Sequence, residues 1–272
     1  MRKALKRTGL LVGLTLLFAA GLAAWRSMEA ALQFLAGYVI ELSLSMDNLF
    51  AIALIFDYFA VPNPWRQRAL HWGLIGVVAM RGVIILLGAA LVQRFRWLLY
   101  VMGAFLLFTG VKWAVAKGEV VRPRDNAVVR LARRMFPVTG GFEGGRFFGK
   151  IEGRPALTPL FLALLMVETT DILFAMDSIP AVFAVTQDAF IILTSNLFAV
   201  LGLRALYFVL VGAMGRFRHL KRGLACVLIF IGAKMLAAHW WRLPTATSLA
   251  VVVLILGVAI ALSGPASAKE PR

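Results

Sequence analysis

A series of long apolar runs limits what this 272-residue chain can fold into. A helix needs about 20 mainly apolar residues to cross a bilayer, and several runs approach or exceed this length. The strands of a membrane barrel would instead alternate in hydrophobicity over segments of about ten residues. We therefore expect an all-α membrane protein with about eight transmembrane helices. The runs cover residues 8–24, 34–60, 69–92, 97–116, 157–186, 189–214, 223–241 and 245–264.

The composition agrees with a membrane setting and excludes several other classes. Hydrophobic residues make up 61% of the chain and charged residues 15%, against about 25% charged residues in soluble domains. The net charge is +16, but Lys and Arg lie in short loops between apolar runs and form no basic face for nucleic acid. The single cysteine, Cys226, excludes an internal disulfide and a Cys-rich metal or redox motif.

The basic residues also predict the orientation of the chain. If the chain starts in the cytoplasm, most of its 29 Lys and Arg residues fall on the inner side, as the positive-inside rule requires. We therefore expect both termini in the cytoplasm and membrane lipids as the surroundings. The first run follows four basic residues and also resembles a signal peptide, so its cleavage or retention is left open.

Two apolar runs contain the same pattern of acidic residues. Residues 41–48 read ELSLSMDN and residues 171–178 read DILFAMDS, so each segment begins with an acid and ends with Met, Asp and a short polar residue. A carboxylate at the bilayer centre costs about 2.5–3.5 kcal/mol on insertion scales. Acids in such matched positions therefore indicate a functional site.

The matched acids belong to a longer internal repeat. The tripeptide Arg-Phe-Arg at 94–96 precedes Gly-Val-Lys at 110–112, and Arg-Phe-Arg at 216–218 precedes Gly-Ala-Lys at 232–234 at the same spacing. Each copy holds three spans, and an odd number forces the second copy through the membrane in the opposite sense. Such inverted repeats are typical of secondary transporters, whose sites lie at the repeat interface. We expect a single transmembrane domain over 1–272, with repeat one at 34–116, repeat two at 157–241 and peripheral helices at 8–24 and 245–264.

Between the repeats lies the longest polar stretch, residues 117–156, which we expect to be a basic cytoplasmic loop. Its segment 126–136 places apolar and basic residues on opposite sides of a helix, which suits a short helix on the inner membrane surface. A solvated basic linker is the alternative. The Gly-rich segment 140–149 is not a phosphate-binding P-loop, because Ile151 stands where a P-loop needs Ser or Thr. We expect this segment to be a flexible loop.

The polar residues of the two motifs suit a hard or borderline dication. Mn²⁺ prefers carboxylate, carbonyl and water oxygens. We expect Asp47 and Asp177 to assemble the site from facing helices, with Glu41 and Asp171 as outer ligands or proton carriers. The full set of candidate metal ligands is Glu41, Asp47, Asn48, Glu168, Asp171, Asp177 and Ser178.

Arg81 and Arg204 occupy equivalent positions within the spans of the two repeats. Arginine stays protonated in proteins, so each side chain needs a carboxylate, carbonyls or water inside the bundle. One interpretation is a permanent ion pair with a motif acid. The other is a charge-compensating and gating role, in which the arginine neutralises the acids when the site is empty and moves aside for the metal.

Three segments resemble the signature blocks of the TerC/Alx family: residues 41–48, residues 171–181 and residues 194–204. The resemblance covers about residues 34–241. It implies a protein of the bacterial inner membrane that is linked to manganese export and to tellurite resistance.

These observations predict a secondary transporter that exports a divalent cation, with Mn²⁺ as the first candidate, other divalent cations as alternatives and no organic cofactor. Expelling a dication against the membrane potential needs a driving ion, and buried carboxylates suit exchange for protons. Paired aspartates in membrane helices can also activate water for peptide cleavage, as in an intramembrane protease. We do not expect such an enzyme, since neither a Gly-x-Gly-Asp run nor a His-Glu-x-x-His motif occurs. The alternative is a metal-binding scaffold or sensor without transport, and homo-oligomerisation is left open.

Overall fold

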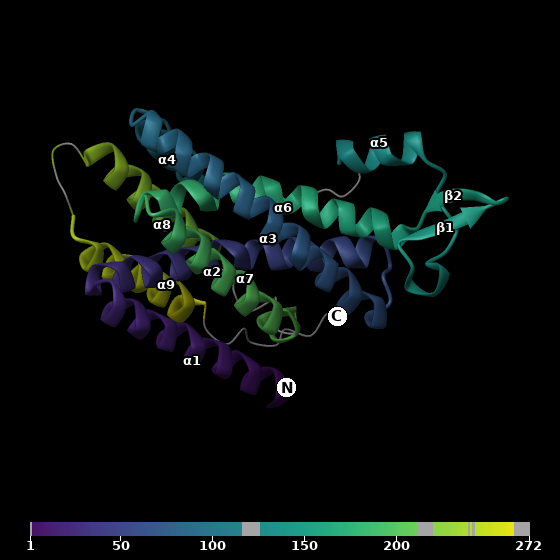
Figure 1. Cartoon of the computed structure of the whole chain (residues 1–272), viewed down its shortest axis with the longest axis horizontal. Coiled ribbons are helices and arrows are strands. Elements are labelled where there is room, and N and C mark those ends of the chain that lie inside the picture. Colours follow the sequence, from purple (N-terminus) through teal and green to yellow (C-terminus); the bar gives the residue numbers. More distant parts are fainter. Residues whose placement is uncertain (1, 116–125, 212–219, 239, 241–242, 264–272) are drawn as a thin grey trace, which may run out of the picture. The chain divides into compact units, whose positions relative to one another are not determined.

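The computed structural model describes residues 2–115, 126–211, 220–238, 240 and 243–263, without the side chains of residues 2–8, 47 and 204–211. Within these residues eight long helices occur, and each overlaps one of the predicted apolar runs (Figure 1). They are α1 (Arg2–Trp25), α2 (Met28–Tyr58), α3 (Asn63–Arg94), α4 (Leu98–Val115), α6 (Pro159–Phe183), α7 (Ala189–Val211), α8 (Leu220–Ala237) and α9 (Thr245–Leu262).

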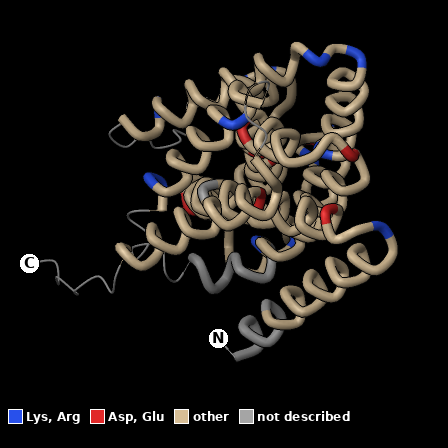
Figure 2. The backbone as a smooth tube through the Cα atoms, turned by 90° about the vertical axis from the view of Figure 1, so that its left-hand side faces the viewer, with Lys and Arg blue, Asp and Glu red and all other residues tan. Residues whose placement is uncertain are grey.

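Among the described residues, five helices are long and apolar enough to cross a membrane by length and composition: α2, α3, α4, α6 and α9. Figure 2 shows long stretches of helix that carry no charged residue. The chain is therefore mostly helical and suited to several membrane passes. The count of eight spans and the inverted sense of the repeats stay predictions.

The segment between the predicted repeats is more ordered than expected, and the all-α prediction is wrong there. Strands β1 (Phe148–Ile151) and β2 (Arg154–Leu157) form an antiparallel hairpin, preceded by the short 3-10 helix η2 (Glu143–Gly145). The turn residues Glu152 and Gly153 both have positive φ, 51° and 81°, as a type I′ hairpin turn requires. Strands of four residues are too short for their periodicity to be recognised in the sequence.

The short helix predicted in this segment is confirmed. Helix α5 (Ala127–Met135) begins after Asn126, whose side chain accepts hydrogen bonds from the backbone N–H groups of Val128 and Val129. This is the usual way in which Asn satisfies the free donors at a helix start. Residues 116–125 of the expected linker lie outside the described part of the chain.

The chain divides into two compact units. The larger unit comprises Met1–Asp47, Gly82–Lys117 and Met176–Arg272, and the smaller unit comprises Asn48–Arg81 and Gly118–Ala175. Helices α2, α3 and α6 contribute to both units, so each predicted repeat does so as well.

In the larger unit, α4 and α8 pack closely along each other (Figure 1). The close approach depends on glycine. A Cβ atom added at Gly232 would lie 2.6 Å from the backbone nitrogen of Leu107, and one added at Gly110 would lie 2.8 Å from the backbone nitrogen of Ile229. Such small residues let helix backbones approach each other in membrane proteins.

In the smaller unit, α5 lies beside the first half of α6 (Figure 1). Asn126 Nδ2 at the start of α5 donates a hydrogen bond to Thr169 Oγ1 of α6, at 2.9 Å. The end of α5 leads toward the hairpin, where Thr139 N donates a hydrogen bond to the carbonyl oxygen of Leu157 at 2.8 Å. This arrangement holds α5 and the hairpin against the helix that carries the second acidic motif.

Candidate metal centre

A buried ion pair between Arg81 of α3 and Asp171 of α6 stands at the centre of the candidate site. Arg81 Nε lies 3.0 Å from Asp171 Oδ2, and Arg81 Nη2 lies 2.9 Å from Asp171 Oδ1. The two side chains are only 3% and 2% exposed. The two-pronged geometry is the strong form of an arginine–carboxylate contact. The contact therefore holds the Asp171 carboxylate in a fixed orientation.

Asn48 of α2 joins the first acidic motif to the second. Its Nδ2 donates a hydrogen bond to Asp171 Oδ1 at 2.5 Å. Because an ionised carboxylate can only accept hydrogen bonds, this contact fixes which end of the amide faces Asp171. Asn48 Oδ1 is buried and has no hydrogen-bond partner among the described residues. It is thus an oxygen donor that a cation can use.

Glu168 stands one turn before Asp171 on α6 and lies within electrostatic range of it. Its carboxylate packs against α3 at a glycine, where a Cβ atom added at Gly76 would lie 2.4 Å from Glu168 Oε1. Glu168 Oε2 is buried, and no hydrogen bond reaches it from the part of the chain that the structure describes. Gly76 therefore makes the room that Glu168 occupies.

Asn48, Arg81, Glu168 and Asp171 all belong to the smaller unit. Two carboxylates and one guanidinium group belong to this set, so with both acids ionised these three side chains together carry one negative charge. An uncompensated charge among apolar helices is costly, and it favours a cation at this place. Chemically, the cluster offers carboxylate and amide oxygens, which hard divalent cations prefer.

Three other predicted ligands with described side chains belong to the larger unit. Glu41 is fully buried on α2, and Ser45 Oγ one turn later donates a hydrogen bond to Glu41 Oε1 at 2.7 Å. Ser178 is buried, and its Oγ has no hydrogen-bond partner among the described residues. Asp177 is half-buried and accepts a hydrogen bond from Thr109 of α4, with Lys112 within electrostatic range.

Two predicted residues fall on side chains outside the described set, namely Asp47 of α2 and Arg204 of α7. Their roles stay predictions. Within the described residues, no group of three or more His, Cys, Asp or Glu side chains is placed to hold a metal ion. The smaller unit thus brings together two acids and one amide, and the expected pairing of Asp47 with Asp177 stays untested.

Several contacts were not foreseen from the sequence. The neighbours of Asp177, Thr109 and Lys112, come from a helix far away in the chain. Lys112 was visible as a repeated residue, but nothing in the sequence indicated which acid it would approach. Nothing in the sequence indicated that Gly76 contacts Glu168, because it is one glycine within an apolar run.

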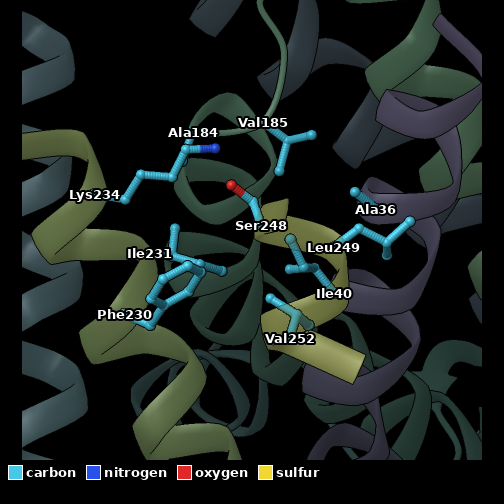
Figure 3. A pocket seen from close by; sticks show the side chains of 10 residues that line it. All are labelled: Ala36, Ile40, Ala184, Val185, Phe230, Ile231, Lys234, Ser248, Leu249 and Val252. Atoms are coloured by element: carbon cyan, nitrogen blue, oxygen red, sulfur yellow. The ribbon is translucent and has the colours of Figure 1, made fainter. Parts of the chain in front are cut away.

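The repeat counterpart of Lys112 is Lys234 of α8, which lies in the larger unit. Figure 3 shows its side chain together with Ser248 of α9 at a small, mostly apolar cavity, which Ile40 of α2 also lines. The cavity measures about 10 Å³, close to the volume that one water molecule needs. Glu29 lies within electrostatic range of Lys234. The ammonium group thus has an acidic neighbour in the same unit.

Comparison with known proteins finds a family of membrane proteins. The model of the integral membrane protein TerC family matches residues 26–270. An uncharacterized membrane protein of Myxococcus xanthus, STKORF319, is 46% identical over 262 residues, which are 96% of this chain and 82% of that protein.

Two further relatives carry more descriptive names. The putative membrane-bound redox modulator Alx of Escherichia coli K12 is 49% identical over 226 residues, 83% of this chain and 70% of that protein. The chloroplastic thylakoid membrane protein TERC of Arabidopsis thaliana is 41% identical over 259 residues, 95% of this chain and 67% of that protein. No solved structure matches the chain significantly.

Proposed function

Because this chain belongs to the TerC family of integral membrane proteins, we propose that it exports a divalent metal cation from the cytoplasm, with Mn²⁺ as the first candidate, in exchange for protons. The expected setting is a bacterial inner membrane, with both termini in the cytoplasm. The observation that carries the proposal is the buried cluster of Glu168, Asp171, Asn48 and Arg81 on helices suited to crossing a membrane.

The donor set of this cluster suits the proposed substrate. Mn²⁺ takes carboxylate, carbonyl and water oxygens. Glu168 Oε2 and Asn48 Oδ1 are buried oxygens without hydrogen-bond partners among the described residues. Asp171 supplies a third oxygen ligand once Arg81 releases it. Glu41, Asp47, Asp177 and Ser178 belong to the larger unit and stay candidate ligands on the strength of the sequence motifs.

The charge balance argues for exchange. A dication adds two positive charges to a cluster whose excess is one negative charge, so its arrival favours the withdrawal of a guanidinium group. We assign this charge-compensating and gating role to Arg81, and by the repeat to Arg204. When the metal leaves, protons on the carboxylates restore the balance.

The energetics require a coupled ion. Moving a dication outward against the membrane potential costs about 4.6 kcal/mol per 100 mV, twice the cost for one charge. The sequence has no ATP-binding motif, and a proton gradient supplies energy of this order. Transport that runs unchanged after collapse of the pH gradient would contradict proton exchange.

Uptake of Mn²⁺ into proteoliposomes that contain only the purified protein tests the proposal. We expect Asp171→Asn and Glu168→Gln to lower the rate at least tenfold, because each removes a proposed ligand charge. The matched control is Asp57→Asn, since Asp57 lies on α2 but is a 64% exposed side chain paired with Arg66. Equal rates for the Asp171 and Asp57 variants would contradict the proposed site.

Gly76→Ala makes a finer test, because it displaces Glu168 without removing a charge. The added Cβ would meet the end of a flexible side chain, so the fold can adjust while the carboxylate moves. We expect weaker Mn²⁺ uptake with a normal unfolding temperature. Gly82→Ala on the same helix has open space around the added atom and should behave like the unchanged protein.

The second candidate is a membrane scaffold or sensor that binds metal without transporting it, for instance as an accessory of metal homeostasis or tellurite resistance. The buried two-pronged pair of Arg81 and Asp171 favours it, because such a pair also suits a static structural role. Metal binding by calorimetry together with no uptake into proteoliposomes would support this candidate and contradict export.

A further inference from the structure

The smaller unit carries an apolar groove that the proposed transport does not use. Its walls come from α5, from the first half of α6 and from the hairpin, and its volume is about 470 Å³. This volume lies within the range of ligand-binding sites, about 300–1,000 Å³. The groove contains almost no polar surface, so its occupant is apolar where it touches the walls.

The apolar face of α5 is left open to the surroundings. Leu131, Met135 and Phe148 line the groove and are 56%, 65% and 61% exposed. Side chains of this size rarely gather on a surface that faces only water. Phe161 and Leu165 form the opposite wall and belong to α6, which is long and apolar enough to cross a membrane. Within a bilayer, the acyl chains of surrounding lipids could therefore reach the groove.

The position of the groove is fixed by two contacts. At one end, Asn126 caps α5 and donates a hydrogen bond to Thr169 of α6. At the other end, Arg133 places its guanidinium carbon 5.9 Å from the ring centre of Phe59, which directly follows α2. The open apolar face is therefore a fixed feature of the smaller unit.

The surrounding segment has a strong positive excess. Residues 126–157 contain two acidic residues, Glu143 and Glu152. The basic residues of the same segment are Arg130, Arg133, Arg134, Arg146, Lys150 and Arg154. The hairpin register assigns one of these to the groove side. Lys150 pairs with Pro155 and Phe148 pairs with Leu157, so these four side chains share one face of the hairpin. Of the four hairpin residues that line the groove, Phe148, Pro155 and Leu157 lie on this face and only Ala156 lies on the other. Arg154 pairs with Ile151 on the opposite face.

We propose that this groove binds one anionic phospholipid, with an acyl chain between α5 and α6 and the phosphate at Lys150 on the hairpin. The apolar walls match the acyl chain, and the basic excess matches the negative headgroup charge. A zwitterionic lipid with the same chains fits the walls but gains less from the basic residues. The inference does not depend on metal export, since it concerns a different surface of the chain.

Native mass spectrometry of the full chain in detergent tests this inference. The protein is titrated with phosphatidylglycerol, with phosphatidylcholine of the same acyl chains, and with glycerol 3-phosphate as a headgroup without chains. We expect phosphatidylglycerol to bind most tightly and glycerol 3-phosphate to give no complex. Lys150→Gln should weaken phosphatidylglycerol binding about fivefold, the effect of one basic residue near a membrane surface.

Two variants control the experiment. Arg154→Gln removes the same charge from the other hairpin face and should have a clearly smaller effect than Lys150→Gln. Ala132→Trp fills the groove and should abolish binding of both lipids. Equal affinity for the two lipids, or equal effects of the Lys150 and Arg154 variants, would overturn the proposal. So would a protein dimer that Ala132→Trp disrupts while lipid binding persists, because the groove would then hold a second copy.

Discussion

At the residue scale, the contact between Arg81 and Asp171 decides the electrostatics of the candidate site. Both side chains are almost fully buried, and Asn48 adds a further hydrogen bond to the same carboxylate. A buried pair of this kind gains little net stability when intact, but breaking it leaves an unpaired buried charge. The pair therefore fixes the geometry of the candidate site, and under the proposed function a cation must supply the energy that separates it.

This reasoning predicts a non-additive mutational cycle. Arg81→Gln should destabilise the protein by about 3–5 kcal/mol, because Asp171 loses its cationic partner. Adding Asp171→Asn to this variant should restore part of the lost stability, since the unpaired charge is gone. Unfolding in detergent measures both effects. A double variant as unstable as the sum of the two single variants would show that the pair is not coupled.

At the element scale, the contact between α4 and α8 has the reciprocity of a two-fold arrangement. Gly110 approaches Ala225 and Ile229, while Gly232 approaches Gly103 and Leu107. The offset of 122 residues that relates Gly110 to Gly232 also relates Gly103 to Ala225 and Leu107 to Ile229. Contacts in which residue i meets j and j meets i are what a two-fold axis produces. This pattern supports the internal repeat.

We expect this helix contact to tolerate no side chain larger than hydrogen at its glycines. Gly232→Ala should lower stability by about 1–3 kcal/mol, because the added carbon overlaps the α4 backbone. Gly110→Ala should act similarly if the two positions are equivalent. Gly257→Ala on α9 is the matched control, since nothing lies near its added Cβ and alanine favours a helix. Thermal unfolding in detergent compares the three variants, and equal melting temperatures would refute the tight contact.

At the scale of the whole molecule, the distribution of charge predicts the orientation of the chain in the membrane. Basic residues gather in alternate connections, as the positive-inside rule describes. If the chain has eight spans, an even number, the two termini share one side. We then expect the long basic segment with α5 and the hairpin to face the cytoplasm, where anionic lipid headgroups attract it.

The orientation is tested with reporters fused after the last residue. A fluorescent protein that matures only in the cytoplasm should be bright, and alkaline phosphatase, which is active only outside, should be inactive. The reverse result would place the C-terminus outside and would require an odd number of spans or the opposite starting side. A fusion within residues 116–125 serves as an internal control and should give the cytoplasmic pattern.

The sequence alone determined the helical class, the positions of the long helices and the identity of the acidic motifs. Hydrophobicity over about 20 residues is a property of the local chain, and α2, α3, α4, α6 and α9 accordingly fall on predicted runs. The hairpin at 148–157 was not predicted, because its strands are too short to show the alternation of apolar and polar residues that marks a strand.

Only the tertiary structure decided the partners of the polar residues. Arg81 pairs with Asp171, Asn48 of the first motif donates a hydrogen bond to Asp171 of the second, and Glu168 packs against Gly76. The reason is that a charge in an apolar bundle takes whichever partner the packing brings within hydrogen-bond distance. The residue types and their spacing in the sequence show that these polar side chains need partners, whereas the packing of the helices decides which partners they have.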